Sequence, residues 1–180
     1  MPPLHCNQRG MTLAEVLVAL PIITIGLLAL LSVIPLSTYA IQDGSQTSTA
    51  TFLANQRLEQ ARNAQWTATC GVVIPGPATQ VDKLGVSAPS TAAPTDPSNT
   101  VTFADESSMA PPYGRYSRQV RITDSVAGAP TCDAFGNMTG TGIRQATVTV
   151  TYTPLSATGK NAVSGPRSVN VTMQIAQRPQ

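Results

Sequence analysis

The carboxylate of Glu15 stands at the start of a long apolar run, where it needs a chemical partner. From residue 16 to residue 34 the sequence has no charged residue, and its interruptions are Pro21, Thr24, Gly26 and Ser32. An acidic side chain at the middle of a bilayer costs roughly 2.5–3.5 kcal/mol on insertion scales, so residues of this kind generally have a partner and a function. We therefore expect Glu15 to meet either a cation or a set of backbone amides.

The residues Thr12-Leu13-Ala14-Glu15 offer the amide solution. They fit the capping-box pattern, in which the hydroxyl and the carboxylate accept hydrogen bonds from amides at the start of a helix. A carboxylate in the first turn also suits the positive end of the helix dipole. The sequence leaves both roles open, because one side chain can serve as a cap and as the partner of a cation.

Acid–base and metal chemistry finds few candidates in this sequence. The one histidine is His5, which precedes the apolar run, so a chain that lost this leader would contain none. That composition argues against His-based acid–base catalysis, Ser-His-Asp triads and His-containing metal sites. No phosphate loop, pair of catalytic carboxylates or metal-ligand cluster stands out. The sequence predicts a protein that is not an enzyme, with no cofactor, no metal and no small-molecule substrate.

The cysteines are Cys6, Cys70 and Cys132, and the first of them lies before the apolar run. The other two would lie together on the far side of a membrane, where oxidising conditions favour a disulfide. A bond between Cys70 and Cys132 closes a loop of about 63 residues, which stabilises a fold by roughly 4 kcal/mol in the chain-entropy account. The alternative is two unpaired buried thiols.

The apolar run of about 19–20 residues is long enough to cross a bilayer as a helix. By the positive-inside tendency, Arg9 stays cytoplasmic and the C-terminal part is exported. Cleavage after Ala40, at the small-x-small site Thr38-Tyr39-Ala40, would discard the run and release a secreted β-rich binding module or adhesin. Cleavage between Gly10 and Met11 would keep the run as an anchor. The length of the run and the acid at its start favour this second route.

The segment Gly10-Met11-Thr12-Leu13-Ala14-Glu15, continuing to Leu20, resembles the N-terminal motif of type IV prepilins and pseudopilins. In that family a short leader ends in Gly, a prepilin peptidase cuts after it on the cytoplasmic side, and the new terminus is methylated. The resemblance implies that Gly10 ends the leader and that Met11 becomes the N-methylated terminus. It implies that Glu15 pairs with the terminal amine of a neighbouring subunit during assembly. A buried carboxylate is tolerable where a cation meets it in low dielectric.

The helix and the late strands are most similar to a minor pilin of the PilV kind or to a minor pseudopilin of type II secretion. The resemblance implies a structural subunit that contributes to the assembly or priming of a filament. Its partners would be other pilins or pseudopilins, reached through the N-terminal helix, and the prepilin peptidase. The protein would sit in the bacterial inner membrane as a single-pass protein with its head in the periplasm. It would then enter a pilus at the cell surface or a periplasmic pseudopilus.

One long helix is predicted from about residue 11 to residue 64, softened near Gly44. Pro21 and Pro35 each remove a backbone hydrogen bond and are expected to kink it. The predicted fold class is α+β, a pilin-like ladle whose long N-terminal helix, transmembrane in its first half, packs on a small antiparallel sheet. The predicted division is a leader (1–10), a transmembrane and assembly helix (11–38), an amphipathic helix half (39–66) and an exported β-rich head (67–180) with an irregular Pro-rich region (75–114).

Alternation of apolar and polar residues predicts half-buried antiparallel strands at 116–122, 146–153 and 168–175. Two weaker strand candidates lie at 70–74 and 101–103. We expect a three- or four-stranded meander whose apolar face needs a cover. The expected cover consists of Phe52, Leu53 and Leu58 of the helix together with Trp66. Region 75–114 is expected to be an irregular surface excursion.

Arg115, Arg118 and Arg121 lie close to Tyr113 and Tyr116 around the first of these strands. Basic residues beside aromatic ones can bind single-stranded nucleic acid. Alternation, however, puts Arg118 on the opposite face from Arg115 and Arg121. The net charge of +2 implies no strong general attraction to nucleic acid. A solvated edge strand protected by its charges explains the cluster equally well, so nucleic acid is not an expected partner.

Overall fold

The computed structural model describes residues 11–71, 75–125, 130–140, 142–154 and 165–179. The predicted leader (1–10), with Gly10, lies outside these residues, as do residues 72–74 of the weak strand candidate at 70–74. Cys70 and Gly71, the described part of that candidate, are not in a strand. The chain divides into two compact units, Met1–Gln42 and Asp43–Gln180.

Helix α1 spans Leu13–Asn63, and it continues through Pro21, Pro35 and Gly44. The predicted helix is therefore confirmed to within two residues at its start and one at its end. Extending the amphipathic half to Trp66 was wrong, because Trp66 begins strand β1 (Trp66–Thr69). The helix closes with a tight turn in which the Ala64 amide donates to the carbonyl of Ala61, at 3.2 Å. Such three-residue bonds commonly satisfy the last carbonyls of a helix.

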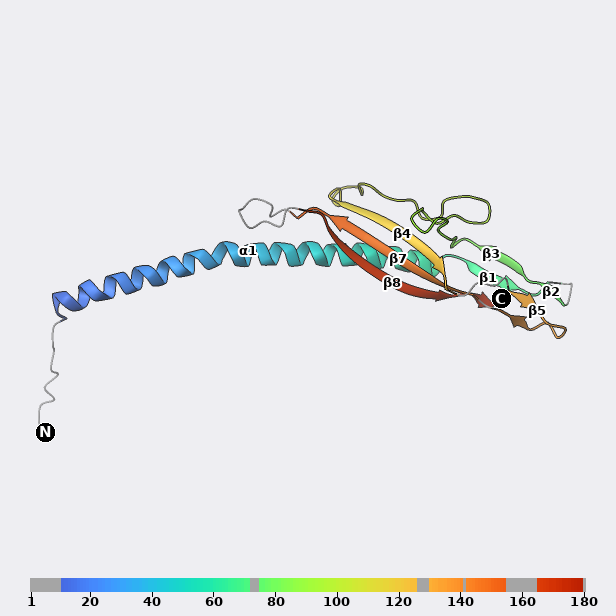
Figure 1. The fold of residues 1–180 in the computed structure, drawn as a ribbon, viewed down its shortest axis with the longest axis horizontal. Coiled ribbons are helices and arrows are strands. Elements are labelled where there is room, and N and C mark those ends of the chain that lie inside the picture. The colour runs from blue at the N-terminus through green and yellow to red at the C-terminus, as the bar shows by residue number, and fades with distance from the viewer. Residues whose placement is uncertain (1–10, 72–74, 126–129, 141, 155–164, 180) are drawn as a thin grey trace, which may run out of the picture. The chain divides into compact units, whose positions relative to one another are not determined.

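The strands of the second unit form three small sheets (Figure 1). The main sheet has the order β4-β7-β8 and is antiparallel throughout. The second sheet has the order β3-β1-β9, with β9 parallel to β1, and the third has the order β2-β5-β6. Their bounds are β2 Gly76–Pro77, β3 Thr79–Asp82, β4 Tyr116–Asp124, β5 Thr131–Cys132, β6 Met138–Thr139, β7 Ile143–Tyr152, β8 Arg167–Ala176 and β9 Arg178–Pro179.

The main sheet is the predicted meander, with the short β5 and β6 placed between β4 and β7 in the chain. Alternation along β7 buries Val148, Val150 and Tyr152 and leaves the threonines between them partly exposed. On β8 the residues predicted to face inward, from Val169 to Ile175, are only half-buried. They pack against the core, but β8 is an edge strand and one of its sides has no neighbouring strand in the described sheet.

The cover of this sheet is a stripe on α1 made mostly of small residues. Ala50, Leu53, Ala54, Leu58 and Ala61 are buried, and they belong to one core with the inward residues of β4 and β7. These positions recur every three or four residues and so share one helix face.

Three of the four residues of the predicted cover are buried, and the third of these is Trp66. Leu53 and Leu58 are confirmed, whereas placing Phe52 in the core was wrong, because its side chain is 59% exposed. At about 100° per residue, Phe52 lies about 200° around the helix from Ala50 and so faces away from the buried stripe.

Most of the Pro-rich region lies at the surface, as predicted, but parts of it join the sheets and the core. It contains β2 and β3, and its irregular part, 83–115, buries Leu84 and Phe103 in the main core. The expected strand at 101–103 is reduced to an isolated bridge between Val101 and Thr95. Composition indicated the irregular backbone correctly, but it did not indicate that Leu84 and Phe103 would anchor that backbone.

Segment 83–115 also closes the outer edge of β4. The Ser87 amide donates to the carbonyl of Ile122 at 2.8 Å, and the Ile122 amide donates to the Ser87 hydroxyl at 3.0 Å. Glu106 and Arg118 exchange both of their backbone bonds, at 2.8 and 2.9 Å. The Met109 amide donates to the carbonyl of Tyr116 at 3.1 Å. Backbone groups that would otherwise be left unpaired at a sheet edge are thereby satisfied.

A buried arginine joins the main sheet to the second sheet. The guanidinium of Arg144, on β7, lies 2.7 Å from a carboxylate oxygen of Asp82 and 2.7 Å from one of Asp124. It also lies over the indole ring of Trp66, 4.4 Å from the ring centre. The side chains of Arg144 and Asp82 are both more than nine-tenths buried. A charge in such a place is tolerated only when opposite charges and hydrogen bonds surround it.

We expect Arg144→Ala to lower the free energy of unfolding by about 3–5 kcal/mol, because it leaves the buried Asp82 carboxylate without its cation. The matched control is Arg167→Ala, which removes the partly exposed ion pair of Arg167 with Asp43 and should cost at most about 1 kcal/mol. Urea unfolding of the full chain in detergent, followed by circular dichroism, gives both values. Equal losses in the two variants would contradict the assignment of Arg144 as the principal buried charge.

Candidate functional site

The start of α1 carries the capping box that the sequence offers. The Glu15 amide donates to the Thr12 hydroxyl at 3.3 Å, and the Thr12 amide donates to Oε2 of Glu15, also at 3.3 Å. Two amides at the helix start are thus satisfied reciprocally. Met11 comes just before the helix, with its side chain 73% exposed. Gly10, the predicted last residue of the leader, lies outside the described residues.

The first unit exposes apolar side chains on every side of α1. An 18-residue window of this helix has a mean hydropathy of 2.7, and none of that window is buried. An amphipathic helix on a soluble domain would show one apolar stripe, whereas a helix that is apolar all round belongs in lipid or among other helices. By length and composition α1 can cross a membrane.

Hydroxyl groups inside the apolar part of α1 are satisfied by the helix itself. Thr24 donates to the carbonyl of Pro21 at 2.9 Å, and Ser32 donates to the carbonyl of Ala29 at 2.7 Å. Ser37 and Thr38 both donate to the carbonyl of Ile34. Internal bonding of this kind is what a segment in lipid needs, since no water is available there. Both prolines lie within the helix, and the kinks expected at Pro21 and Pro35 stay a prediction.

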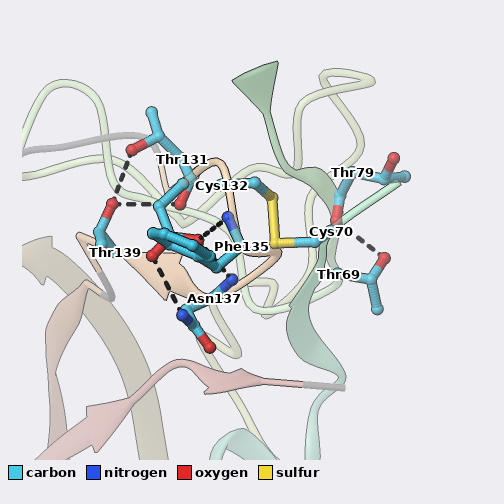
Figure 2. The surroundings of a disulfide bond; sticks show 9 residues. Thr69, Cys70, Thr79, Thr131, Cys132, Phe135, Asn137 and Thr139 are labelled. Carbon is cyan, nitrogen blue, oxygen red and sulfur yellow. Dashed lines mark hydrogen bonds between the residues drawn. A yellow bond between two sulfur atoms is a disulfide. The ribbon is translucent and has the colours of Figure 1, made fainter. Parts of the chain in front are cut away.

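The structure joins Cys70 and Cys132 in a disulfide, with their Cα atoms 5.6 Å apart (Figure 2). The bond links the residue after β1 to the last residue of β5. Beyond it, the β5–β6 turn is tied by Asp133, which accepts bonds from the amides of Phe135 and Asn137. Hydrogen bonds from the backbone and side chain of Asn137 hold the pKa of Asp133 below its ordinary value.

The arginines considered for nucleic-acid binding do not form one surface. Arg115 is exposed in a turn, and Arg121 pairs with Asp105 at 2.6 Å. Arg118 points the other way, as alternation predicted, but the interpretation as a solvated strand was wrong for it. Its side chain is 7% exposed, lies 2.9 Å from Glu106 and donates to the carbonyl of Leu53 on α1. Through these bonds the Arg118 side chain links helix α1, strand β4 and segment 83–115.

Glu106 is shared by two arginines, because Arg57 of α1 also approaches it, at 3.4 Å. Arg57 lies over the ring of Phe103, 5.2 Å from its centre. Burial, together with the neighbouring charge of Arg118, lowers the pKa of Arg57. Glu106 and its two arginines, Arg57 and Arg118, therefore attach segment 83–115 to both the helix and β4.

Sequence reasoning missed Arg144 as a structural centre, although a signal was present. Arg144 falls in phase with Ala146, Val148 and Val150, so alternation places it on the buried face of β7. A charged residue in that phase predicts buried partners. Which carboxylates would supply them was not readable, since Asp82 lies 62 residues away in the chain. Among the residues that the structure describes, no three His, Cys, Asp or Glu side chains gather as a metal site would require.

Comparison with known families gives one match. Residues 5–31 match the family described as "Prokaryotic N-terminal methylation motif". No curated protein and no solved structure matches the chain. The matched segment contains Met11, the capping box and much of the exposed apolar helix, so the chain has a leader of the type IV pilin kind. A long apolar N-terminal helix followed by small antiparallel sheets is consistent with the type IV pilin-like fold.

Acid is expected to weaken the ion pair between Asp105 and Arg121, which links segment 83–115 to β4. The hydrogen bond from Arg121 places the pKa of Asp105 below its ordinary value of 3.8. The stabilisation is therefore complete above 3.8 and is lost as the pH falls through the lowered pKa. Because the pair is partly exposed, the effect should be under about 1 kcal/mol.

The measurement is amide exchange at Glu106 and Met109 as the pH falls from 3.8 through the lowered pKa of Asp105. It compares the wild type with Arg121→Gln. The acid-induced gain in exchange should be smaller in Arg121→Gln. An identical acid response in both proteins would contradict a role for this pair.

Proposed function

We propose that this protein is a membrane-anchored, non-enzymatic subunit of a type IV pilus or a related filament, of the minor pilin kind. The proposal rests on two features that lie in the same segment. Residues 5–31, which match the methylation motif, include the capped start of α1, and the apolar surface of the helix that begins there is exposed on all sides. Such a surface needs lipid before assembly and other helices after it.

In this proposal a prepilin peptidase removes residues 1–10 by cutting between Gly10 and Met11, and Met11 is then N-methylated. The cut leaves the amide of Thr12 in place, so the capping box survives processing. Residues 11–38 act as the transmembrane and assembly helix. The part from residue 67 onward is the head, exported to the periplasm. Processing is done to this chain by other proteins, and the chain itself carries out no reaction.

Glu15 has room for two roles. Its cap uses Oε2, and among the described residues nothing hydrogen-bonds to Oε1. A carboxylate can accept several hydrogen bonds. We propose that the free oxygen receives the terminal amine of a neighbouring subunit's first residue, which neutralises the acid in a low-dielectric setting. The resemblance to family members supports this pairing, and the capping geometry is compatible with it.

A pseudopilin of a type II secretion system is the second candidate, and the same N-terminal observations favour it. The alternative of a secreted module cleaved after Ala40 requires removal of the apolar run. Ala40 lies inside α1, with helix continuing on both sides of it. A peptidase would therefore have to unwind the helix to cut there.

Mass spectrometry of the mature protein separates these routes. We expect an N-terminal peptide that begins at a methylated Met11, because the proposed cut lies between Gly10 and Met11, within the stretch that matches the methylation motif. A mature chain that begins at Ile41 would contradict both the anchored state and the filament role.

Glu15→Gln tests whether the charge of Glu15 matters beyond the cap. Gln at this position still completes a capping box, so helix start and leader cleavage should be preserved. Without the negative charge, incorporation into filaments should fall to the level of Glu15→Ala, because the neighbour's amine has no counter-ion. Immunoblots of sheared filaments, set against total membrane protein, give the incorporated fraction. Wild-type incorporation of Glu15→Gln together with loss in Glu15→Ala would leave Glu15 as a cap alone.

A further inference from the structure

The two edges of the main sheet are treated differently. The edge of β4 is closed by segment 83–115 through the backbone bonds of Ser87, Glu106 and Met109. On β8, the hydrogen bonding to β7 runs in unbroken register from Arg167 to Ala176. No residue in the described part of the chain bonds to the backbone groups on its other side.

The register identifies those outward groups. On β4 the backbone groups of Arg118 and Ile122 point away from β7, so their neighbours at odd positions bond to β7. Antiparallel alternation then turns the even residues of β7 toward β8. Through the pairing of Val148 with Val171, odd residues of β8 bond to β7 and even residues face outward. The outward set is Ser168, Asn170, Thr172, Gln174 and Ala176.

The β8 edge lacks the features that usually prevent strand pairing. Natural edge strands are commonly protected by charges, prolines, bulges or short length. Residues 168–176 contain no charged residue and no proline, and the ten-residue pairing with β7 has no bulge. The half-buried side chains of Val169, Val171 and Met173 leave an incomplete apolar row on the side that packs on the core. An added strand would complete both the backbone bonding and that row.

A cavity at the C-terminal end of β8 favours an added strand that carries a negative charge. It has a volume of about 300 Å³ and is lined by residues 173–178 of the chain together with Arg62 of α1. Arg62 and Arg178 give it two cations, and only Arg62 has an acidic partner among the described residues, the exposed Glu59 at 3.4 Å. Guanidinium groups bind carboxylates strongly, so this end of the edge favours an incoming strand that carries a carboxylate.

The same charges disfavour a second copy of β8 as the occupant. An antiparallel pairing of two β8 strands centred on Thr172 would set Arg167 of each copy beside Gln177 and Arg178 of the other. Like charges at adjacent positions destabilise a strand pair.

We propose that the outer edge of β8 accepts, by antiparallel strand addition, an extended segment of a different protein. That segment alternates apolar and small polar residues and has an acidic residue at its N-terminal end, where it meets Arg62 and Arg178. The inference stands apart from the filament proposal, because it rests only on residues after Asp43.

A nine-residue peptide tests the proposal. It is acetylated, begins with glutamate and continues with alternating threonine and valine. Opposed residues of an antiparallel pair share a face, so the threonine amides would bond to β8 and the valine amides are N-methylated to prevent self-association. The control peptide has its threonine amides methylated instead. Amide exchange of the full chain in detergent micelles, measured by NMR, reports binding.

The expected result is exchange at Asn170, Thr172 and Gln174 that is slowed at least about tenfold by the peptide, used at about 1 mM, and not by its control. Thr172→Pro removes an outward amide without breaking a bond to β7, and prolines are tolerated at such positions. It should weaken binding at least about tenfold, whereas Thr172→Val should not. Replacing the glutamate of the peptide with glutamine should weaken binding to the wild type but not to the Arg62→Gln, Arg178→Gln double variant.

Three outcomes would overturn the proposal. They are an absence of slowed exchange at about 1 mM peptide, equal binding of the control peptide, and full binding by Thr172→Pro. Equal affinity of the glutamate and glutamine peptides for the wild type would remove the acidic residue from the proposal.

Discussion

The contact between one stripe of α1 and the inward face of β4 and β7 holds the second unit together. Ala50, Ala54 and Ala61 keep that stripe narrow, and Leu53 and Leu58 fill the space between helix and sheet. Other parts of the unit add residues to the same core. Segment 83–115 contributes Leu84 and Phe103, and β1 of the second sheet contributes Trp66.

Buried arginines connect parts of the unit that apolar packing alone would leave separate. Arg118 reaches from β4 to the carbonyl of Leu53 and to Glu106, while Arg144 gathers Asp82 and Asp124 beneath Trp66. Each guanidinium has several donors in a fixed plane, so one side chain can bind several elements at once. An irregular, proline-rich segment thereby obtains a defined position without regular secondary structure. One sheet edge is closed as a result, and the other stays available.

Local patterns in the sequence were enough to predict much of this fold. Spacing within a few residues was enough to predict the helix, the three long strands and the capping box. It was also enough to predict which residues of β7 face inward. What spacing could not supply was the outcome of contacts between distant segments. The burial of Leu84 and Phe103, the partners of Arg144 and the exposure of Phe52 depend on which surfaces meet in three dimensions. At the N-terminus the motif was readable, because its chemistry is contiguous in the chain.

The disulfide has a topological consequence for the region it encloses. Cys70 and Cys132 bracket β2, β3, β4 and the whole of segment 83–115 within one covalent ring. If a protease severed a single peptide bond anywhere in that ring, the two pieces would remain one molecule as long as the sulfurs stayed oxidised. A single break in the long irregular stretch therefore releases no fragment while the disulfide is intact.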